Sequence, residues 1–391
     1  MSTEPPRDSP EAPAAPGSAL SGRLRNDIRR SGPMRFSRFL ERALYAPGEG
    51  YYAGGGPGIG ASGDFVTAPE ISPVFASCLA RGIAPALQVP GAAVLELGAG
   101  NGTLAKDLLM ALERLGCLPE SYRILEVSGA LRNRQETLIG ALPARVASRV
   151  TWLDSLPESP LDGVILANEV ADALVFEAFA VTAEGPRYRG VADGPGGLCW
   201  TELPADAELL RFVAAAAEAR GEALPPVYVS EFRPLLAPWV ASLAACLQTG
   251  AMIVVDYGLP RRELYSDDRR AGTLCCFSGQ RAHPDPFRAP GREDITAWVD
   301  FTAIAEAFHE AGLLLEGFTT QAAYLIENGY TDAVAEIADT ASLEDRLSAL
   351  AAARRLVMPG EMGERFRVIA ASRNLRTALP GFSGLDLTRT L

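Results

Sequence analysis

The sequence predicts an α/β fold built on a parallel, doubly wound sheet, and two observations lead to this prediction. Short apolar runs typical of buried strands alternate with segments of helical periodicity, at the spacing of βαβ units. The first of these runs continues through a glycine-rich turn directly into a helix, as in Rossmann-like sheets that bind a ligand at that turn.

The first half of the expected sheet consists of four strands with helices between them. A helix over 103–115 follows the glycine-rich turn, and Ser128 could cap a second helix. Helical spacing also begins near Leu24, and a later apolar run, 251–256, is expected to rejoin the sheet. The four strands are predicted at 94–97, 123–127, 150–152 and 163–167.

Composition and periodicity divide the chain into four parts. By composition, 1–32 is expected to be a disordered tail rich in Pro and Ala. A helical N-terminal region with a glycine-rich loop follows at 33–90, and the Rossmann-like core at 91–260 carries inserted α+β elements at about 176–247. The remainder, 261–391, combines a long loop segment with α/β elements that complete the core.

Composition also narrows the classes of function. The 391 residues carry a formal net charge of −12, which argues against a general nucleic-acid binder. An acidic surface suits a cationic substrate, but acidity also serves solubility alone. The six cysteines form no CxxC pair and only two histidines accompany them, so we expect no metal site. Without an apolar run of membrane-spanning length or a signal core, we expect a cytoplasmic protein with no membrane partner.

The glycine-rich turn is the strongest local signal. Gly98, Gly100 and Gly102 let the backbone turn sharply and bring a ligand close to a helix N-terminus. Their spacing differs from the dinucleotide fingerprint, since Thr103 stands where another glycine would be expected. The carboxylate of Glu96 could hold an ammonium group and would repel a pyrophosphate. The turn therefore favours S-adenosylmethionine (SAM) over a dinucleotide, with a glycine-rich turn of another α/β protein as the alternative.

Acidic and amide side chains follow two further strands. Glu126 ends the second strand, where an acid can accept both hydroxyls of a ribose. Asn168, Glu169 and Asp172 follow the fourth strand, where a methyl acceptor would approach, and could bind a guanidinium or take a proton. The alternatives are a solvated acid at a strand end and an acidic cap of the next helix.

At 34–372 the chain resembles the MidA-like methyltransferases, a family that includes the mitochondrial assembly factor for respiratory complex I. The resemblance depends on the order and spacing of several motifs, each of them weak alone. These motifs are 36–40, 45–52, 63–72, 96–104, 125–128, 167–174, 256–258, 281–286, 294–296 and 362–366.

The resemblance implies a class I methyltransferase that uses SAM and methylates an arginine of a protein, such as a respiratory-complex subunit, with a homodimer as one expected assembly. It implies catalytic roles for Asn168, Glu169 and Asp172, and substrate contacts for Glu70, Asp256 and His283. The residues it implies for cofactor binding are Glu96, Gly98, Gly100, Gly102, Thr103, Glu126, Gly63, Thr67 and Pro69.

The sequence departs from the family pattern near the expected acceptor pocket. Val170 and Ala171 replace two aromatic residues, Val175 replaces a proline, and 276–280 lacks the usual His and Arg. These changes leave the cofactor assignment intact but keep two alternatives open. One is a small-molecule methyltransferase, and the other is a non-catalytic assembly or binding protein that retains the fold.

Overall fold

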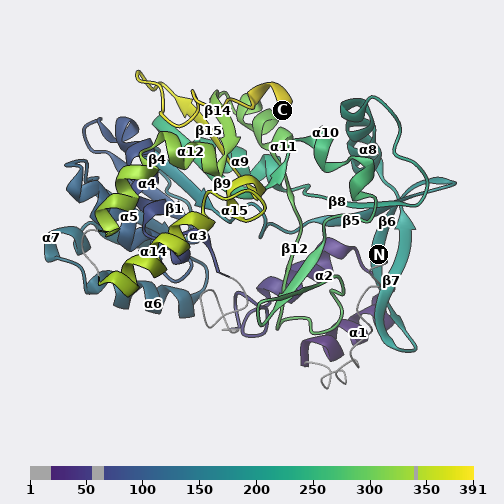
Figure 1. Ribbon diagram of the computed structural model, residues 1–391. Helices are drawn as coiled ribbons and strands as arrows, with labels where there is room; N and C mark the ends of the chain where they lie inside the picture. The colour runs from purple at the N-terminus through teal and green to yellow at the C-terminus, as the bar shows by residue number, and fades with distance from the viewer. Residues whose placement is uncertain (1–18, 55–65, 339–341) are drawn as a thin grey trace, which may run out of the picture.

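The computed structural model describes residues 19–54, 66–338 and 342–391, and its centre is an eight-stranded sheet between two layers of helices (Figure 1). The strand order is β14-β15-β9-β4-β1-β2-β3, with β13 paired to β9, and β15 runs antiparallel to β9. This Rossmann-like sheet confirms the predicted fold class. Its strands are β1 Ala93–Leu97, β2 Ser121–Leu125, β3 Val150–Leu153, β4 Leu161–Asn168, β9 Leu247–Leu259, β13 Val299–Asp300, β14 Leu314–Thr320 and β15 Phe366–Arg373.

Successive side chains of the central strands point to opposite faces, and each face is buried under helices. Val94 and Val164 pack into one apolar core with helices α4 (Val74–Ile83) and α5 (Thr103–Arg114). Their neighbours Leu95 and Ile165 pack into a second core with α9 (Leu236–Ala245) and α11 (Phe301–Glu310). Burial on both faces explains why these strands read as continuous apolar runs.

Two smaller antiparallel sheets extend the fold beyond the central sheet, with the larger one at the right of Figure 1. The predicted insertion forms the sheet β7-β6-β5-β8 and carries helix α8 (Ala207–Arg220). A three-stranded sheet, β11-β10-β12, forms within the predicted long loop segment. Strands of three or four residues show too little alternation to be recognised in the sequence. The strands are β5 Glu177–Thr182, β6 Gly185–Gly194, β7 Gly197–Pro204, β8 Tyr228–Phe232, β10 Cys275–Ser278, β11 Arg281–His283 and β12 Asp294–Thr296.

The N-terminal part is helical, but one prediction about it is wrong. Helix α1 (Ala19–Ser31) lies within the span 1–32 that composition assigned to a disordered tail. The helix forms because Leu20, Leu24 and Ile28 recur at every fourth position, and all three are buried. Residues 1–18 of the predicted tail lie outside the described residues.

Short helices and turns connect the remaining elements. The remaining helices are α2 Phe36–Tyr45, α3 Ala68–Ile71, α6 Gly129–Gly140, α7 Ala144–Ala147, α10 Arg261–Leu264, α12 Gln321–Glu327, α13 Tyr330–Ala338, α14 Leu343–Arg355 and α15 Met362–Arg365, with 3-10 turns at Ala84–Leu87, Asp267–Arg269 and Thr388–Thr390.

The order of the strands indicates at which edge of the central sheet a ligand would bind. The chain runs outward from β1 through β2 to β3, then returns to the other side of β1 as β4. The order of strands therefore reverses between β1 and β4. In open α/β sheets, ligands bind beyond the carboxyl ends of the strands at such a reversal.

Candidate active site

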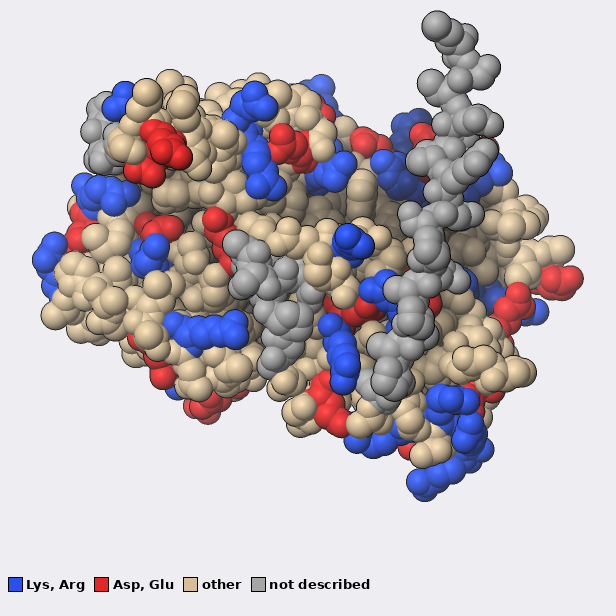
Figure 2. Space-filling view, turned by 60° about the horizontal axis from the view of Figure 1, so that its bottom comes forward, with Lys and Arg blue, Asp and Glu red and all other residues tan. Residues whose placement is uncertain are grey.

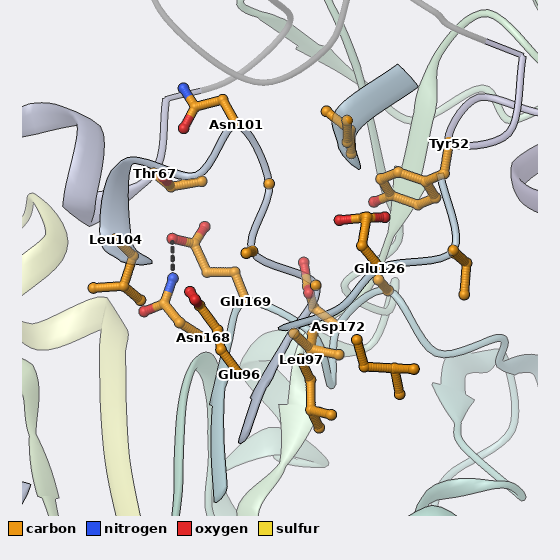
Figure 3. A pocket seen from close by; sticks show the side chains of 18 of the residues that line it. Tyr52, Thr67, Glu96, Leu97, Asn101, Leu104, Glu126, Asn168, Glu169 and Asp172 are labelled. Carbon is orange, nitrogen blue, oxygen red and sulfur yellow. Dashed lines mark hydrogen bonds between the residues drawn. The ribbon is translucent and has the colours of Figure 1, made fainter. Parts of the chain in front are cut away.

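A cavity of about 320 Å³ lies at this edge, beyond the carboxyl ends of β1, β2 and β4 (Figure 3). The N-terminal helical region, the segments and helices that follow strands β1 to β4, and helix α9 contribute to its wall. The lining residues are Tyr45, Tyr52, Thr67, Pro69, Glu96, Leu97, Gly98, Ala99, Gly100, Asn101, Leu104, Leu125, Glu126, Val127, Leu131, Leu156, Asn168, Glu169, Val170, Asp172, Ala173, Trp239 and Leu243.

The glycine-rich turn forms one wall of the cavity. Gly98 and Gly100 each have a φ of 57°, and Gly102 has a φ of 90°, a region that residues with a Cβ rarely adopt. Gly98 and Gly100 line the cavity. Gly102 and Thr103 lie behind the turn, where they begin helix α5, and they do not line it. The turn therefore presents the backbone of Gly98 and Gly100 to the cavity.

Glu96 is buried at the end of β1, with 2% of its surface exposed, and lines the cavity. The hydroxyl of Tyr122 donates a hydrogen bond of 2.7 Å to its carboxylate. Burial raises the pKa of Glu96 to about 7, against the lowering effect of the Tyr122 hydrogen bond. An ammonium group placed beside this carboxylate would favour its charged form, so its environment fits the cationic end of an amino acid.

Glu126 follows β2 and is also buried and cavity-lining. One carboxylate oxygen accepts the Ser128 amide at 2.8 Å, and the other accepts the Gln135 side-chain amide at 3.0 Å. Burial raises the pKa of Glu126, and these donors oppose that shift. A carboxylate can accept about four hydrogen bonds, so Glu126 keeps capacity for a ribose hydroxyl. These features fit the nucleoside part of SAM.

Glu169 and Asn168 lie at the end of β4, next to the end of β1 that carries Glu96 (Figure 3). The φ of Glu169 is 53°, which is unusual for a residue other than glycine, and such strain is typical of functional sites. Its carboxylate accepts long hydrogen bonds of 3.4 Å from the Ala68 amide and from the Asn168 side chain. Burial, together with the nearby charge of Asp172, raises the pKa of Glu169 to about 8.

Asp172 is fixed on three sides. The hydroxyl of Tyr257 donates a hydrogen bond of 2.5 Å to Asp172 Oδ2. The backbone amide of Asp172 donates to the carboxylate of Asp256 at 3.1 Å. Its backbone carbonyl accepts from Arg233 at 2.9 Å. The Oδ1 atom is buried and has no hydrogen-bond partner among the described residues. Asp172 itself lines the cavity. Burial raises the pKa of Asp172.

Two tyrosines stand on the same side of the cavity as Asp172. The rings of Tyr45 and Tyr52 are stacked with centroids 5.5 Å apart. The Tyr45 hydroxyl donates to the Ala173 carbonyl at 2.6 Å, and the Tyr52 hydroxyl donates to Asp294 at 2.9 Å. Aromatic rings beside carboxylates form a wall that suits a cation.

Of the predicted residues at 67–70, Thr67 and Pro69 line the cavity, but Glu70 does not. The carboxylate of Glu70 caps helix α3 at Thr67 and contacts Asn101. Asp256 is buried behind the cavity, where its oxygens hold backbone amides. Gly63 lies outside the described residues.

His283 does not reach the cavity, so its position gives no support to the substrate contact predicted for it. It belongs to β11 of the three-stranded sheet, where its ring lies 3.1 Å from the carboxylate of Glu293. A three-residue strand in a separate sheet could not be positioned from the sequence, and the substrate contact of His283 stays a prediction.

Sequence reasoning assigned no role to several residues of the site. Tyr45 and Tyr52 belong to a motif of the resemblance, but neither their contacts nor the stacking of their rings could be derived from it. Tyr257 is next to a predicted residue, Asp256. Trp239 and Leu243 come from the helix α9, far along the chain, and carry no signal of their own.

Within the described residues, no helix is both long and apolar enough to cross a membrane. On the face of the molecule that Figure 2 shows, acidic and basic side chains are interspersed, so that this face carries charges of both signs.

Comparison with known proteins identifies the chemistry. The sequence model of the Methyltransf_28 family, described as S-adenosyl-L-methionine-dependent methyltransferases, matches residues 78–319. This span contains the glycine-rich turn, Glu126 and the residues that follow β4. The match covers well over half of the chain.

Curated relatives extend the likeness over most of the chain. The protein arginine methyltransferase NDUFAF7, mitochondrial, of Danio rerio is 28% identical over 397 residues, covering 91% of this chain and 87% of its own length. The human protein of the same name is 26% identical and matches 88% of this chain and 81% of its own length.

A crystal structure is more similar still. A Burkholderia thailandensis protein solved with S-adenosyl-homocysteine bound is 42% identical, with a TM-score of 0.89, covering 96% of this chain and 99% of that one. The bound product of SAM agrees with the ligand that the glycine-rich turn and the two buried acids fit.

Proposed function

This chain belongs to the Methyltransf_28 family of SAM-dependent methyltransferases, and we propose that it transfers the methyl group to an arginine side chain of a protein. The observation that carries the proposal is the acidic wall of the cavity that Asn168, Glu169 and Asp172 form after β4. Two oxygens of this wall, Asn168 Oδ1 and Asp172 Oδ1, are buried without hydrogen-bond partners among the described residues, so a guanidinium that reaches them would satisfy both. A guanidinium supplies donors in a planar fork that suits such acceptors.

We assign cofactor binding and acceptor binding to different residues of the cavity. SAM, when bound, supplies a methyl group on a positively charged sulfur. On the cofactor side, we assign Glu96 to the ammonium group, Glu126 to the ribose hydroxyls, and the backbone of Gly98 and Gly100 to close approach. A methyltransferase must mainly orient the acceptor and exclude water, which a cavity with buried walls achieves.

On the acceptor side, Asp172 binds the guanidinium through its free oxygen and keeps the positive charge away from the attacking nitrogen. Glu169 accepts the proton that this nitrogen loses. A carboxyl whose pKa is raised to about 8 is a stronger base than an exposed one, but it is largely protonated at neutral pH. A guanidinium beside it would favour its charged form, and that form accepts the proton. Tyr45 and Tyr52 enclose the cation.

Two comparisons support an arginine acceptor. The NDUFAF7 relatives are named protein arginine methyltransferases and are matched over most of their length. The resemblance to MidA-like proteins makes a respiratory-complex subunit the first protein to test. The cytoplasmic location expected from the sequence and the homodimer stay predictions.

The experiment supplies purified protein with SAM labelled in its methyl group and an extract of the source cells. We expect label in the protein fraction with the unaltered chain, and at least a tenfold slower single-turnover transfer with Glu169→Gln or Asp172→Asn (on the order of 10²–10⁴ for loss of a catalytic base). Calorimetry should show that both variants retain S-adenosyl-homocysteine binding.

Asp162→Asn is the matched control, because Asp162 is at the other end of β4 and outside the cavity. This variant should label protein at the unaltered rate. Label confined to small molecules would contradict the proposal in favour of a small-molecule acceptor. Unchanged rates in both acid variants would reject their assigned roles.

A further inference from the structure

Gln135 is a buried polar residue that contacts the cofactor side of the site without lining the cavity. It belongs to helix α6 and has 0% of its surface exposed. Its amide nitrogen donates to the Gly100 carbonyl at 2.8 Å and to Glu126 Oε2 at 3.0 Å. Its amide oxygen accepts from the indole nitrogen of Trp152 at 2.9 Å.

Trp152 determines which way this amide faces. An indole nitrogen can only donate, so it must meet the oxygen of the Gln135 amide. The nitrogen of the amide then faces two acceptors, a backbone carbonyl and a carboxylate, and donates to both. With the amide reversed, nitrogen would face the indole N–H and oxygen would face two acceptors. The three contacts therefore agree on one orientation.

These contacts join three strand ends of the central sheet. Gly100 belongs to the turn after β1, Glu126 follows β2, and Trp152 lies in β3. A Cβ at Gly102 would lie 3.2 Å from Gln135 Cγ, so the turn also packs closely against this side chain. Gln135 thus touches the two cofactor-side elements that must keep a fixed separation to hold one nucleoside.

Glu126 depends on Gln135 for one of its donors. Besides backbone amides, the Gln135 side chain is the group that lowers the pKa of the Glu126 carboxyl against burial. Without it, one oxygen of a buried carboxylate would lose its donor, and the carboxylate could turn. Hydrogen bonds to a charged group are stronger than neutral ones, so this loss has a measurable effect.

We propose that Gln135 is a positioning residue that holds Glu126 and the glycine-rich turn in one geometry and thereby sets the selectivity of the site for the ribose hydroxyls. This inference rests on the ribose role proposed above for Glu126, and it is independent of the identity of the methyl acceptor.

The test compares binding of S-adenosyl-homocysteine and its 2′-deoxy analogue to the full chain by calorimetry. The unaltered protein should prefer S-adenosyl-homocysteine by about tenfold, the effect of one lost hydrogen bond to a charged group. In Gln135→Met, affinity for S-adenosyl-homocysteine should fall about tenfold and the preference between the two ligands should largely disappear. A merely structural loosening would weaken both ligands equally and leave their ratio unchanged.

Two further variants keep the inference testable if Gln135→Met fails to fold. Trp152→Phe keeps an aromatic ring but removes the donor that orients the amide, together with part of the ring volume, and it should reduce the preference in the same direction by a smaller factor. Gln135→Glu keeps the size of the side chain but places a second carboxylate beside Glu126. This variant should bind S-adenosyl-homocysteine at least as weakly as Gln135→Met.

Gln321→Met is the matched control. Gln321 is another fully buried glutamine, its side-chain amide donates to the backbone carbonyl of Leu356, and it does not line the cavity. This variant should keep the ligand preference even if it is less stable. A preference retained in both Gln135→Met and Trp152→Phe would overturn the inference. An unaltered protein that does not distinguish the two ligands would overturn it together with the ribose role of Glu126, while leaving the arginine proposal untouched.

Discussion

Glu169 is the residue of the site whose backbone and side chain are both held in unfavourable states. Its φ of 53° costs on the order of 1–3 kcal/mol relative to an ordinary conformation. Its carboxyl is surrounded by acids and has only long hydrogen bonds of 3.4 Å. The rest of the fold compensates for both costs, as is typical where a residue is kept for its chemistry rather than for stability.

The raised pKa of Glu169 makes stability depend on pH. The folded value is about 8, and the unfolded chain releases the same proton near the ordinary value of 4.5. Between these values the folded state binds more protons, so its stability falls as pH rises. Glu169→Gln removes this loss, and the variant should be more stable than the unaltered protein by at least about 1 kcal/mol at pH 8.5. Urea unfolding at pH 5 and 8.5 checks this, and a difference that does not grow with pH would contradict it.

Gly100 offers a second test at this scale. A valine there would be strained by the φ of 57° and would extend a side chain from the turn that lines the cavity. Gly100→Val should therefore lower affinity for S-adenosyl-homocysteine beyond detection by calorimetry. Gly116→Val is the control, as Gly116 has a similar φ of 67° but open space around it and no place in the cavity. Normal affinity in the first variant would contradict the cofactor assignment.

At the scale of elements, the register of β4 brings the site together. Strand β4 pairs with β1 on one side and β9 on the other, so that Asn168 is level with Val255. Asp256 and Tyr257 follow immediately and hold Asp172. The acidic wall is thus positioned by strand pairing, and the residues that hold it are far from it in the sequence.

Glycines allow β4 and β9 to approach each other. A Cβ at Gly250 would overlap the backbone of Gly163 on the neighbouring strand, and Gly250 has a φ of 138°. Gly250→Ala should therefore destabilise the protein by about 2 kcal/mol or more, seen as a lower melting temperature. Gly197→Ala, at a φ of 124° but with open space, is the control for backbone strain alone. Equal effects of the two changes would contradict the close approach.

The type of each element decides whether it could be predicted from the sequence. Buried parallel strands such as β1 and β4 are continuous apolar runs, and the turn after β1 requires glycines, so the sequence pattern predicts both. The acids at strand ends follow from the same rule of topology. By contrast, His283 and Tyr52 depend on the packing of short strands and loops against the core, which leaves no periodicity in the sequence. Gln135 looks like any polar residue of an amphipathic helix until its neighbours are known.

At the scale of the whole molecule, the site depends on parts of the chain that are remote from one another. Tyr45 comes from the N-terminal region, Glu96 from the core, and Trp239 from helix α9, near the end of the inserted span. The cavity forms only when these parts come together, so a ligand held in it would bind only the folded chain. S-adenosyl-homocysteine at 100 times its Kd should therefore raise the free energy of unfolding by about 2.7 kcal/mol. Denaturant melts with and without ligand measure this, and an unchanged midpoint would contradict binding at this junction.

The central claim is that the acidic wall receives an arginine, and amino-acid analysis of the methylated product tests it most directly. Protein labelled from methyl-labelled SAM by the purified chain is hydrolysed, and the labelled amino acids are separated. The account predicts label in methylated arginine, and its loss when Asp172→Asn replaces the unaltered chain. Label in any other amino acid, or in methylarginine at an equal rate with the variant, would contradict it.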